Sequence, residues 1–527
     1  GRDATWLAIG ASIFASNIGS EHLIGLAGAG ASSGMAMAHW EIQGWMILIL
    51  GWVFVPFYSR SMVYTMPEFL ERRYNPQSRT ILSVISLVSY VLTKVAVTVY
   101  AGGLVFQQVF GIKELWGIDF FWIAAIGLVV LTALYTIFGG MKSVLYTSVL
   151  QTPILLLGSL IILVLGFKEL GGWDEMMRVC GAVTVNDYGD TMTNLIRSND
   201  DANFPWLGAL IGSAIIGFWY WCTDQFIVQR VLSGKNEKEA RRGTIFGAYL
   251  KLLPVFLFLI PGMIAFALHQ KYIGAGGEGF LPMLANGTAN ADAAFPTLVA
   301  KLLPAGVKGL VVCGILAALM SSLASLFNSS AMLFTIDFYK RFRPETPEKK
   351  LVGIGQIATV VIVILGILWI PIMRSVGDVL YTYLQDVQSV LAPGIAAAFL
   401  LGICWKRTSA QGGMWGLIAG MIIGLTRLGA KVYYSNAGEV ADSTFKYLFY
   451  DMNWLFFCGW MFLFCIIVVI VVSLATEAPT AEKIQGLVFG TATKEQKAAT
   501  RASWNHWDII HTVIILAITA AFYWYFW

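Results

Sequence analysis

Apolar residues occur along this chain in long runs, and short polar segments separate them. A helix that crosses a bilayer needs about 20 consecutive, mostly apolar residues. About 13 runs approach that length and predict an all-α polytopic membrane protein. The expected spans lie near residues 5–35, 41–66, 79–111, 117–139, 143–166, 205–232, 243–269, 296–335, 351–372, 376–405, 411–429, 452–475 and 508–527.

Basic residues between the runs predict how the chain is oriented. Cytoplasmic loops of membrane proteins carry an excess of lysine and arginine. Every second connecting segment is basic here, whereas opposite segments such as 167–204 are sparser in basic charge. We therefore expect the first span to run from inside to outside, in a plasma membrane or bacterial inner membrane. The basic residues are Arg72, Arg73, Arg79, Lys142, Lys235, Lys238, Arg241, Arg242, Lys340, Arg341, Arg343, Lys349, Lys350, Lys406, Arg407, Lys483, Lys494, Lys497 and Arg501.

Composition excludes several classes of function. The chain is 57% hydrophobic and 13% charged, whereas a soluble chain carries about 25% charged residues. A net charge of +4 is too small to suggest a nucleic-acid partner. The six cysteines show no spacing typical of a zinc site or a disulfide framework. No phosphate-cradling loop is present, which disfavours ATP-driven pumping, and no enzyme chemistry is indicated.

Polar residues interrupt two runs near their middle. The first run contains "SNIGSEH" at 16–22, and the sixth contains "WCTDQ" at 221–225. Non-helical backbone at membrane depth is tolerated only where it lines a cavity. An offset of five spans inverts the topology, so two five-helix halves, about 5–166 and 205–405, could be related by an in-plane pseudo-twofold axis. This pattern predicts a ten-helix transport core over 1–405 with its site at the breaks. Residues 406–527 would form about three peripheral spans and a cytoplasmic loop.

Ionisable residues inside spans are costly and mark a pathway or a partner. Lys251 together with a carboxylate or an amide could bind the hydroxyls of a neutral polyol, or it could be a structural counter-ion. We expect Asp224 to pair with a basic residue near the cytoplasmic end, and Lys94 to pack or snorkel. His22 could titrate protons or simply form hydrogen bonds. The full set is Glu21, His22, Glu41, Lys94, Asp224, Lys251 and Asp386.

Hydroxyl and aromatic residues add two candidate features. Ser321 and Ser322 are adjacent in the eighth run, and they could bond to their own backbone or, with unwound carbonyls, hold a sodium ion. Tyr381 and Gln385 are four residues apart and share a helix face. That pair suits either a gate over a polar ligand or an interfacial tyrosine.

Several segments together resemble the sodium/solute symporter family, and most closely its sodium–glucose (galactose) cotransporters. They include "FASNIGSEHLIGLAG", "TMPEFLERRY", "FWYWCTDQFIVQR", "YLKLLPVFLFLIPGMI" and "LMSSLASLFNS", in this order. The resemblance covers roughly residues 5–430. It implies a LeuT-type five-plus-five inverted-repeat core with broken helices one and six.

The resemblance also implies roles for individual residues. The implied solute-binding residues are Asn17, His22, Glu41, Tyr220, Trp221, Lys251 and Gln385. Tyr220 would be the inner gate, and Leu26, Trp40 and Tyr381 the outer gate. The implied sodium ligands are the backbone carbonyls of Ala15, Ile18 and Ala318 and the hydroxyls of Ser321 and Ser322.

The chain departs from the family pattern in a few places. A helix that commonly precedes the first core helix is missing from this sequence. Ser148 stands where the family has an aspartate in span five, and Ala324 replaces a hydroxyl found in members that couple two sodium ions. We therefore expect one sodium per sugar. His22 and Gly44 stand where some bacterial members have amide and serine contacts, which leaves the preferred hexose open.

The expected function is sodium-coupled symport of a hexose, glucose or galactose, into the cell by alternating access. One alternative is a transporter of myo-inositol or another solute. Another is a sugar-gated sensor or channel that binds without accumulating, and a third is coupling to protons through His22. The expected partners are the hexose, sodium and the lipid bilayer; the sequence does not indicate an oligomeric state.

Overall fold

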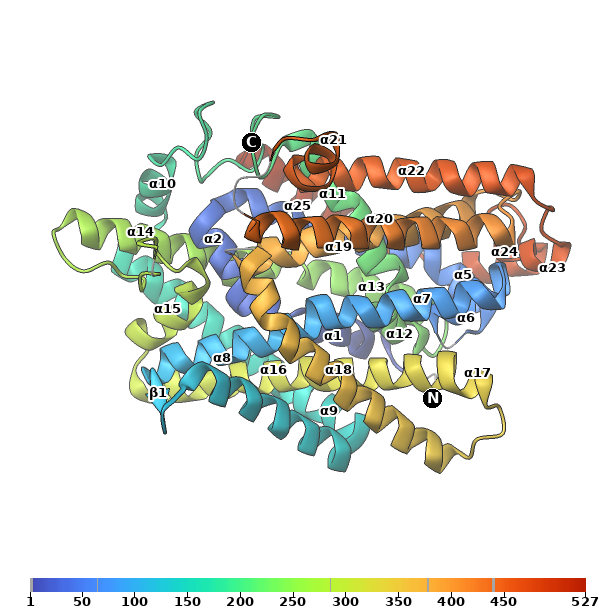
Figure 1. Cartoon of the computed structure of the whole chain (residues 1–527), viewed down its shortest axis with the longest axis horizontal. Helices are drawn as coiled ribbons and strands as arrows, with labels where there is room; N and C mark the ends of the chain where they lie inside the picture. Colours follow the sequence, from blue (N-terminus) through green and yellow to red (C-terminus); the bar gives the residue numbers. More distant parts are fainter. Residues whose placement is uncertain (1–2, 64, 285, 377–378, 438–440) are drawn as a thin grey trace.

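A computed structural model describes residues 3–63, 65–284, 286–376, 379–437 and 441–527, without the side chains of 135, 137–152 and 374–376. Apart from the short hairpin β1 (Glu114–Leu115) and β2 (Ile118–Asp119), the regular elements of this part are helical. The longest helices run roughly side by side along one direction (Figure 1). Eleven helices of the described part are long and apolar enough to cross a membrane. The prediction of an all-α polytopic protein is confirmed.

The first span is broken where its polar residues predict. It consists of α1 (Trp6–Asn17), the π-helical segment η1 (Glu21–Leu26) and α2 (Ala27–Ser33). Ile18 ends α1 in an extended conformation, with φ −81° and ψ 97°. The chain therefore leaves the helix at Ile18 and Gly19, in the middle of an apolar run.

The sixth span is broken in a similar way. It consists of α11 (Trp206–Gly217), the π-helical segment η5 (Phe218–Thr223) and α12 (Gln225–Leu232). Asp224 is extended, with φ −75° and ψ 128°, and its side chain accepts a hydrogen bond from the Phe226 amide at the start of α12. A carboxylate at this position satisfies one of the free amides of the helix and complements its dipole.

The remaining spans of the first half are also irregular. The second begins with η2 (Gly34–Met37) and α3 (Ala38–Glu41), so Glu41 ends a short helix. It continues through α4 (Gly44–Ile49), η3 (Leu50–Phe54) and α5 (Val55–Ser61) and is followed by α6 (Met66–Arg73). The third comprises α7 (Pro76–Ser89), η4 (Tyr90–Val95) and α8 (Ala96–Phe110).

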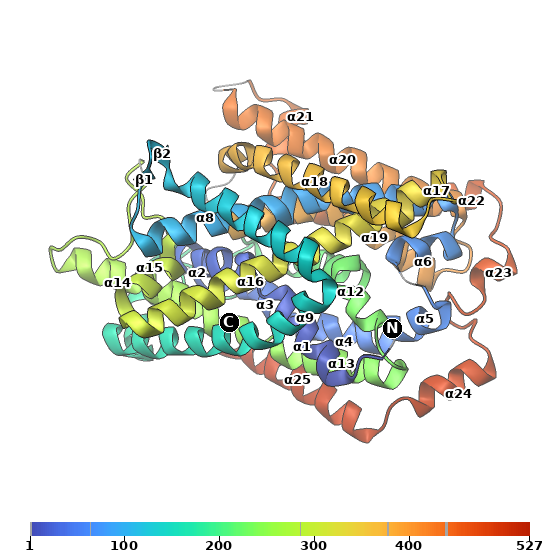
Figure 2. The same ribbon diagram turned by 90° about the horizontal axis from the view of Figure 1, so that it is seen from below.

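The fourth and fifth expected spans, 117–139 and 143–166, form one helix, α9 (Phe120–Leu170), rather than two helices with a loop. The intervening residues contain no proline, so nothing there removes a backbone hydrogen bond. Figure 2 shows α9 folding back on itself, so that its two halves still cross the molecule separately.

The second half contains one further difference from the prediction. The expected span 296–335 is divided into α15 (Ala294–Leu302) and α16 (Ala305–Met332), because extended Leu303 and Pro304 interrupt it. Helix α10 (Trp173–Gly181) lies between the two halves. The other elements of the second half are α13 (Glu237–Leu250), η6 (Val255–Leu259), α14 (Ile260–Gly274), η7 (Ala291–Ala293), η8 (Leu333–Tyr339), α17 (Lys340–Phe342), α18 (Glu348–Val376) and α19 (Leu380–Cys404).

Three long C-terminal helices lie outside the core. They are α20 (Ala410–Asn436), α22 (Trp454–Ala475) and α25 (His506–Tyr525), joined through α21 (Thr444–Lys446), η9 (Tyr447–Asp451), α23 (Ala481–Ile484) and α24 (Lys494–Ala502). Helices α20 and α22 pack on α19, whereas α25 packs on α4 and α13. The basic helices α17, α23 and α24 lie at one end of the molecule, opposite α10 and β1 (Figure 1). This separation fits the expected orientation; the side chain of Lys142 lies outside the described residues.

Candidate functional site

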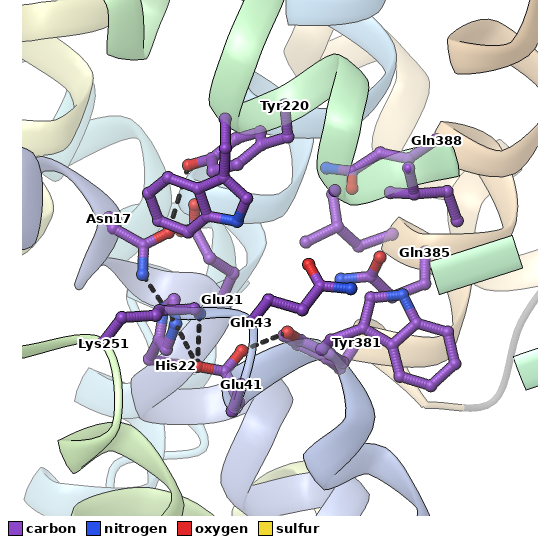
Figure 3. Close-up of a pocket in the computed structure, with 15 residues that line it drawn as sticks. Asn17, Glu21, His22, Glu41, Gln43, Tyr220, Lys251, Tyr381, Gln385 and Gln388 are labelled. Carbon is purple, nitrogen blue, oxygen red and sulfur yellow. Dashed lines mark hydrogen bonds and ion pairs between the residues drawn. The ribbon is translucent and has the colours of Figure 1, made fainter. Parts of the chain in front are cut away.

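A cavity of about 40 Å³ lies beside the breaks in the first and sixth spans. All seven residues expected to bind the solute line it, and several are drawn in Figure 3. One water needs about 10–15 Å³ of such volume, so a molecule of sugar size enters only if the lining side chains move. The lining residues are Asn17, Glu21, His22, Trp40, Glu41, Gln43, Ile216, Gly217, Tyr220, Trp221, Lys251, Tyr381, Leu384, Gln385 and Gln388.

Glu41 is the centre of the polar network in this cavity. Its Oε2 accepts a hydrogen bond from Lys251 Nζ at 2.6 Å and lies 3.2 Å from His22 Nε2. Its Oε1 accepts a hydrogen bond from Tyr381 Oη at 2.5 Å. Glu41 is fully buried, and a buried charge is tolerated only when it is paired and hydrogen-bonded. Both carboxylate oxygens meet that requirement.

The two broken spans are linked directly across the cavity. Tyr220, in η5, donates a hydrogen bond from Oη to Asn17 Oδ1 at 3.2 Å. Asn17 Nδ2 in turn lies 3.2 Å from His22 Nε2. The residue expected to form the inner gate is therefore tied to the end of α1.

Three buried polar atoms of lining residues have no hydrogen-bond partner within the described part of the chain. They are His22 Nδ1, Trp40 Nε1 and Gln385 Oε1. An unsatisfied buried polar group costs about 1–3 kcal/mol. Trp40 Nε1 is a donor and Gln385 Oε1 is an acceptor. A ligand with several hydroxyl groups could satisfy both kinds of atom.

The residues expected to form the outer gate are packed shut. Leu26, Trp40 and Tyr381 are 0%, 3% and 3% exposed. The Trp40 ring stacks on Trp454 of α22, with centroids 5.5 Å apart and planes inclined by 20°. A helix outside the core thus contacts Trp40, one of the residues expected to form the outer gate, and the sequence did not indicate this contact.

The sodium ligands implied by the resemblance lie on two elements that meet. Ala15 and Ile18 are at the end of α1, and Ala318, Ser321 and Ser322 are on α16, which contacts α1. A methyl group on Gly19 would stand 2.8 Å from Ser322 Oγ. That hydroxyl is buried and has no hydrogen-bond partner among the described residues. An unpartnered oxygen beside unwound backbone fits a hard cation that prefers oxygen ligands.

Lys94 packs inside the molecule, which is one of its two expected roles, whereas Asp224 does not pair with a base at the cytoplasmic end. Lys94 does not snorkel to an interface: it is 7% exposed, and its Nζ lies 3.7 Å from the Phe226 ring centroid and 4.7 Å from that of Tyr220. Asp224 Oδ2 faces this lysine at 3.9 Å instead of a base at the cytoplasmic end, and Oδ1 accepts a hydrogen bond from Tyr90. Aromatic faces and a carboxylate together compensate the buried ammonium.

Sequence reasoning gave no role to several lining residues. Gln388 is three residues after Gln385 on the same helix, so helical spacing could have revealed it. Gln43 donates from Nε2 to the Ser213 carbonyl at 2.7 Å, a tertiary contact without a sequence signal.

Asp386 forms an ion pair with Lys431 of α20 and does not line the cavity. The side chain of Ser148 lies outside the described residues, and Ala324 is buried.

Comparisons with known proteins add independent findings. A model of the sodium:solute symporter family matches residues 1–424. Human sodium/myo-inositol cotransporter 2 is 36% identical over 504 residues, covering 93% of this chain and 74% of the relative. Sheep sodium/glucose cotransporter 1 is 39% identical over 495 residues, covering 90% and 74%.

The fold also matches a solved structure. The substrate-bound outward-open state of a Na+-coupled sialic acid symporter has a TM-score of 0.68 and 22% sequence identity, covering 91% of this chain and 92% of that one. At this identity the likeness concerns the fold alone. It agrees with the LeuT-type arrangement that the family resemblance implies.

Proposed function

Because the chain belongs to the sodium:solute symporter family, we propose that it carries a hexose, glucose or galactose, into the cell together with sodium. Members of this family are multi-pass membrane proteins that couple solute transport to Na+. The observation that carries the proposal is the cavity itself. It combines a compensated Glu41–Lys251 pair with unpartnered donors and acceptors on His22, Trp40 and Gln385.

This polar set favours a neutral solute with several hydroxyls. Lys251 is already held by Glu41 at 2.6 Å, so an anionic solute would have to break that pair. A hydroxyl can donate to the carboxylate and accept from the ammonium at the same time. Tyr381 already places one hydroxyl on Glu41, and a sugar hydroxyl could replace it when the outer gate opens.

The proposed transport cycle uses the two breaks and the two gates. Sodium from outside binds between the unwound part of the first span and Ser322, and this favours the state in which the solute site is accessible from outside. The solute then binds, and Leu26, Trp40 and Tyr381 close over it. The core rocks about the site, and both ligands leave past Tyr220 into the cytoplasm, where sodium is scarce.

One sodium per sugar is energetically sufficient. Moving one charge through 100 mV yields about 2.3 kcal/mol, and a tenfold sodium gradient adds about 1.4 kcal/mol. Together they sustain a sugar gradient of roughly a few hundredfold. A single ion site at the break therefore accounts for accumulation.

A second candidate solute is myo-inositol. Several relatives that are 36–38% identical over more than 500 residues are sodium/myo-inositol cotransporters. Inositol is also neutral and carries many hydroxyls, so the same donors and acceptors suit it. The arrangement of those hydroxyls is what distinguishes the two solutes.

Competition binding tests the proposal. We expect glucose or galactose to displace a radiolabelled hexose from the purified protein in saturating sodium. Lys251→Met should weaken binding by about a hundredfold, because a charged hydrogen bond is worth about 1.5–3 kcal/mol. Lys308→Met is the control, because Lys308 bonds a backbone carbonyl outside the cavity. Binding of labelled myo-inositol without binding of the labelled hexose would select the second solute, and unchanged binding in Lys251→Met would contradict the assigned site.

A further inference from the structure

We propose that Glu21 is a further ligand of the coupling sodium ion and joins the ion site to the solute cavity. The inference rests on the proposed function, because it concerns the same sodium. Glu21 is the first residue of η1, two positions after the glycine at which the first span is broken. It is half-buried and lines the cavity, on the side where Asn17 and Tyr220 lie in Figure 3.

The Glu21 carboxylate and the Ser322 hydroxyl lie close to the same point beside Gly19. A methyl group on Gly19 would stand 2.8 Å from Glu21 Oε2 and also 2.8 Å from Ser322 Oγ. The two oxygens are thus at most twice that distance apart, on either side of the unwound backbone. A hard cation takes oxygen ligands at about 2.3–2.6 Å in flexible geometry. One ion between them can therefore reach both with little movement.

Glu21 has no direct ion pair in the described part of the chain. Glu41 is paired with Lys251, and Asp224 faces Lys94. The two lysines act on Glu21 only from a longer distance, and its carboxylate accepts a hydrogen bond from Ser20 Oγ at 3.2 Å. A carboxylate at membrane depth is costly without a partner. A bound sodium ion supplies the missing positive charge.

Ser20 extends this oxygen-rich surface into the third span. Its oxygen also lies 3.0 Å from the Thr98 hydroxyl, from which it can accept a hydrogen bond, and this contact holds the start of η1 against α8. Ser322 Oγ has no hydrogen-bond partner among the described residues. The first span therefore presents a carboxylate, and α16 an unpartnered hydroxyl, to the same space, and both oxygens can bind a cation.

This placement gives Glu21 a role in coupling. The same carboxylate lines the solute cavity and faces the ion site, so binding of sodium changes the charge on the cavity wall. Linkage requires that the effect of sodium on solute affinity equals the effect of solute on sodium affinity. Removing the charge at Glu21 should weaken sodium binding directly. It should weaken solute binding only at sodium concentrations too low to fill the ion site.

Binding of radioactive sodium to the purified full chain, without solute, tests the inference. We expect Glu21→Gln to bind sodium about tenfold more weakly or worse, which corresponds to about 1.4 kcal/mol. Glu114→Gln, on an exposed hairpin residue, is the control and should bind sodium as the wild type does.

Two outcomes overturn the inference. The first is unchanged sodium affinity in Glu21→Gln. If that variant does not fold, Glu21→Asp replaces it: a shorter carboxylate ligand must change the preference for Na+ over Li+, and an unchanged preference overturns the inference. A wild-type protein that binds no sodium would instead contradict the proposed function, so the two failures can be told apart.

Discussion

At the residue scale, Glu41 shows how a charge inside a membrane protein can be both stable and useful. Each of its oxygens has a strong partner, Lys251 on one and Tyr381 on the other. The sequence indicated that Lys251 could act with a carboxylate, because charges within apolar runs are rare and need partners. It could not reveal that Tyr381 donates to the same carboxylate, since the two residues are 340 positions apart.

The pair can be separated into its structural and binding contributions. Glu41→Gln should destabilise the fold by about 3–5 kcal/mol, because Lys251 is left as a buried, unpaired charge. Combining it with Lys251→Met should restore much of the thermal stability but not solute binding. Thermal unfolding in detergent and hexose binding, measured on the single and double variants, check this. A double variant that also binds hexose would show that the pair serves structure alone.

Gly19 tests the proposed ion site by size rather than by charge. Gly19→Ala places a methyl group 2.8 Å from both Ser322 Oγ and Glu21 Oε2, where it would exclude a cation. We expect the sodium concentration for half-maximal hexose uptake to rise by about tenfold or more. Gly309→Ala is the matched control, because nothing lies within 4 Å of its added methyl. Equal sodium dependence in both variants would place the ion elsewhere.

At the element scale, the broken helices were the feature most accessible to sequence reasoning. Polar residues and glycine inside an apolar run leave backbone groups unsatisfied unless they line a site, and both predicted breaks are present. For Lys94 the sequence left packing and snorkelling both open. Whether a lysine reaches an interface or is buried depends on which helices surround it, and Phe226 and Asp224 reach it only through tertiary packing.

The contact between α22 and the outer gate leads to a prediction for that helix. Trp454→Ala removes the ring that stacks on Trp40, and such pairs are worth about 0.5–1.5 kcal/mol. The outward-open state should therefore become more populated. In a cysteine-free background, Gln388→Cys should react faster with an impermeant thiol reagent from outside. Trp460→Ala, on the same helix but 62% exposed, should leave the rate unchanged. Equal rates in the two variants would contradict a gate role for α22.

At the scale of the whole molecule, the apolar runs correctly predicted a helical membrane protein. They did not predict where individual helices begin and end. The expected spans 117–139 and 143–166 fall in one helix that folds back, α9, and the expected span 296–335 is divided between α15 and α16. Hydropathy measures only how apolar a segment is, whereas helix ends depend on local bonding and proline. The stacking of Trp454 of α22 on Trp40 likewise could not be predicted from the sequence.

The orientation of the molecule can be tested from its two ends. Asp174, on α10, and Glu345, between α17 and α18, are exposed at opposite ends (Figure 1). In a cysteine-free background, Asp174→Cys should react with an impermeant thiol reagent in intact cells. Glu345→Cys should react only after the membrane is permeabilised. The reverse pattern would invert the assigned topology.

The most direct test of the central claim is accumulation of radiolabelled hexose in proteoliposomes. We predict that an inward sodium gradient drives uptake above the external concentration, and that potassium alone does not. Glu41→Gln should abolish accumulation. Binding without accumulation would indicate a sensor. Accumulation that is driven by a proton gradient and is indifferent to sodium would contradict the account and shift attention to His22.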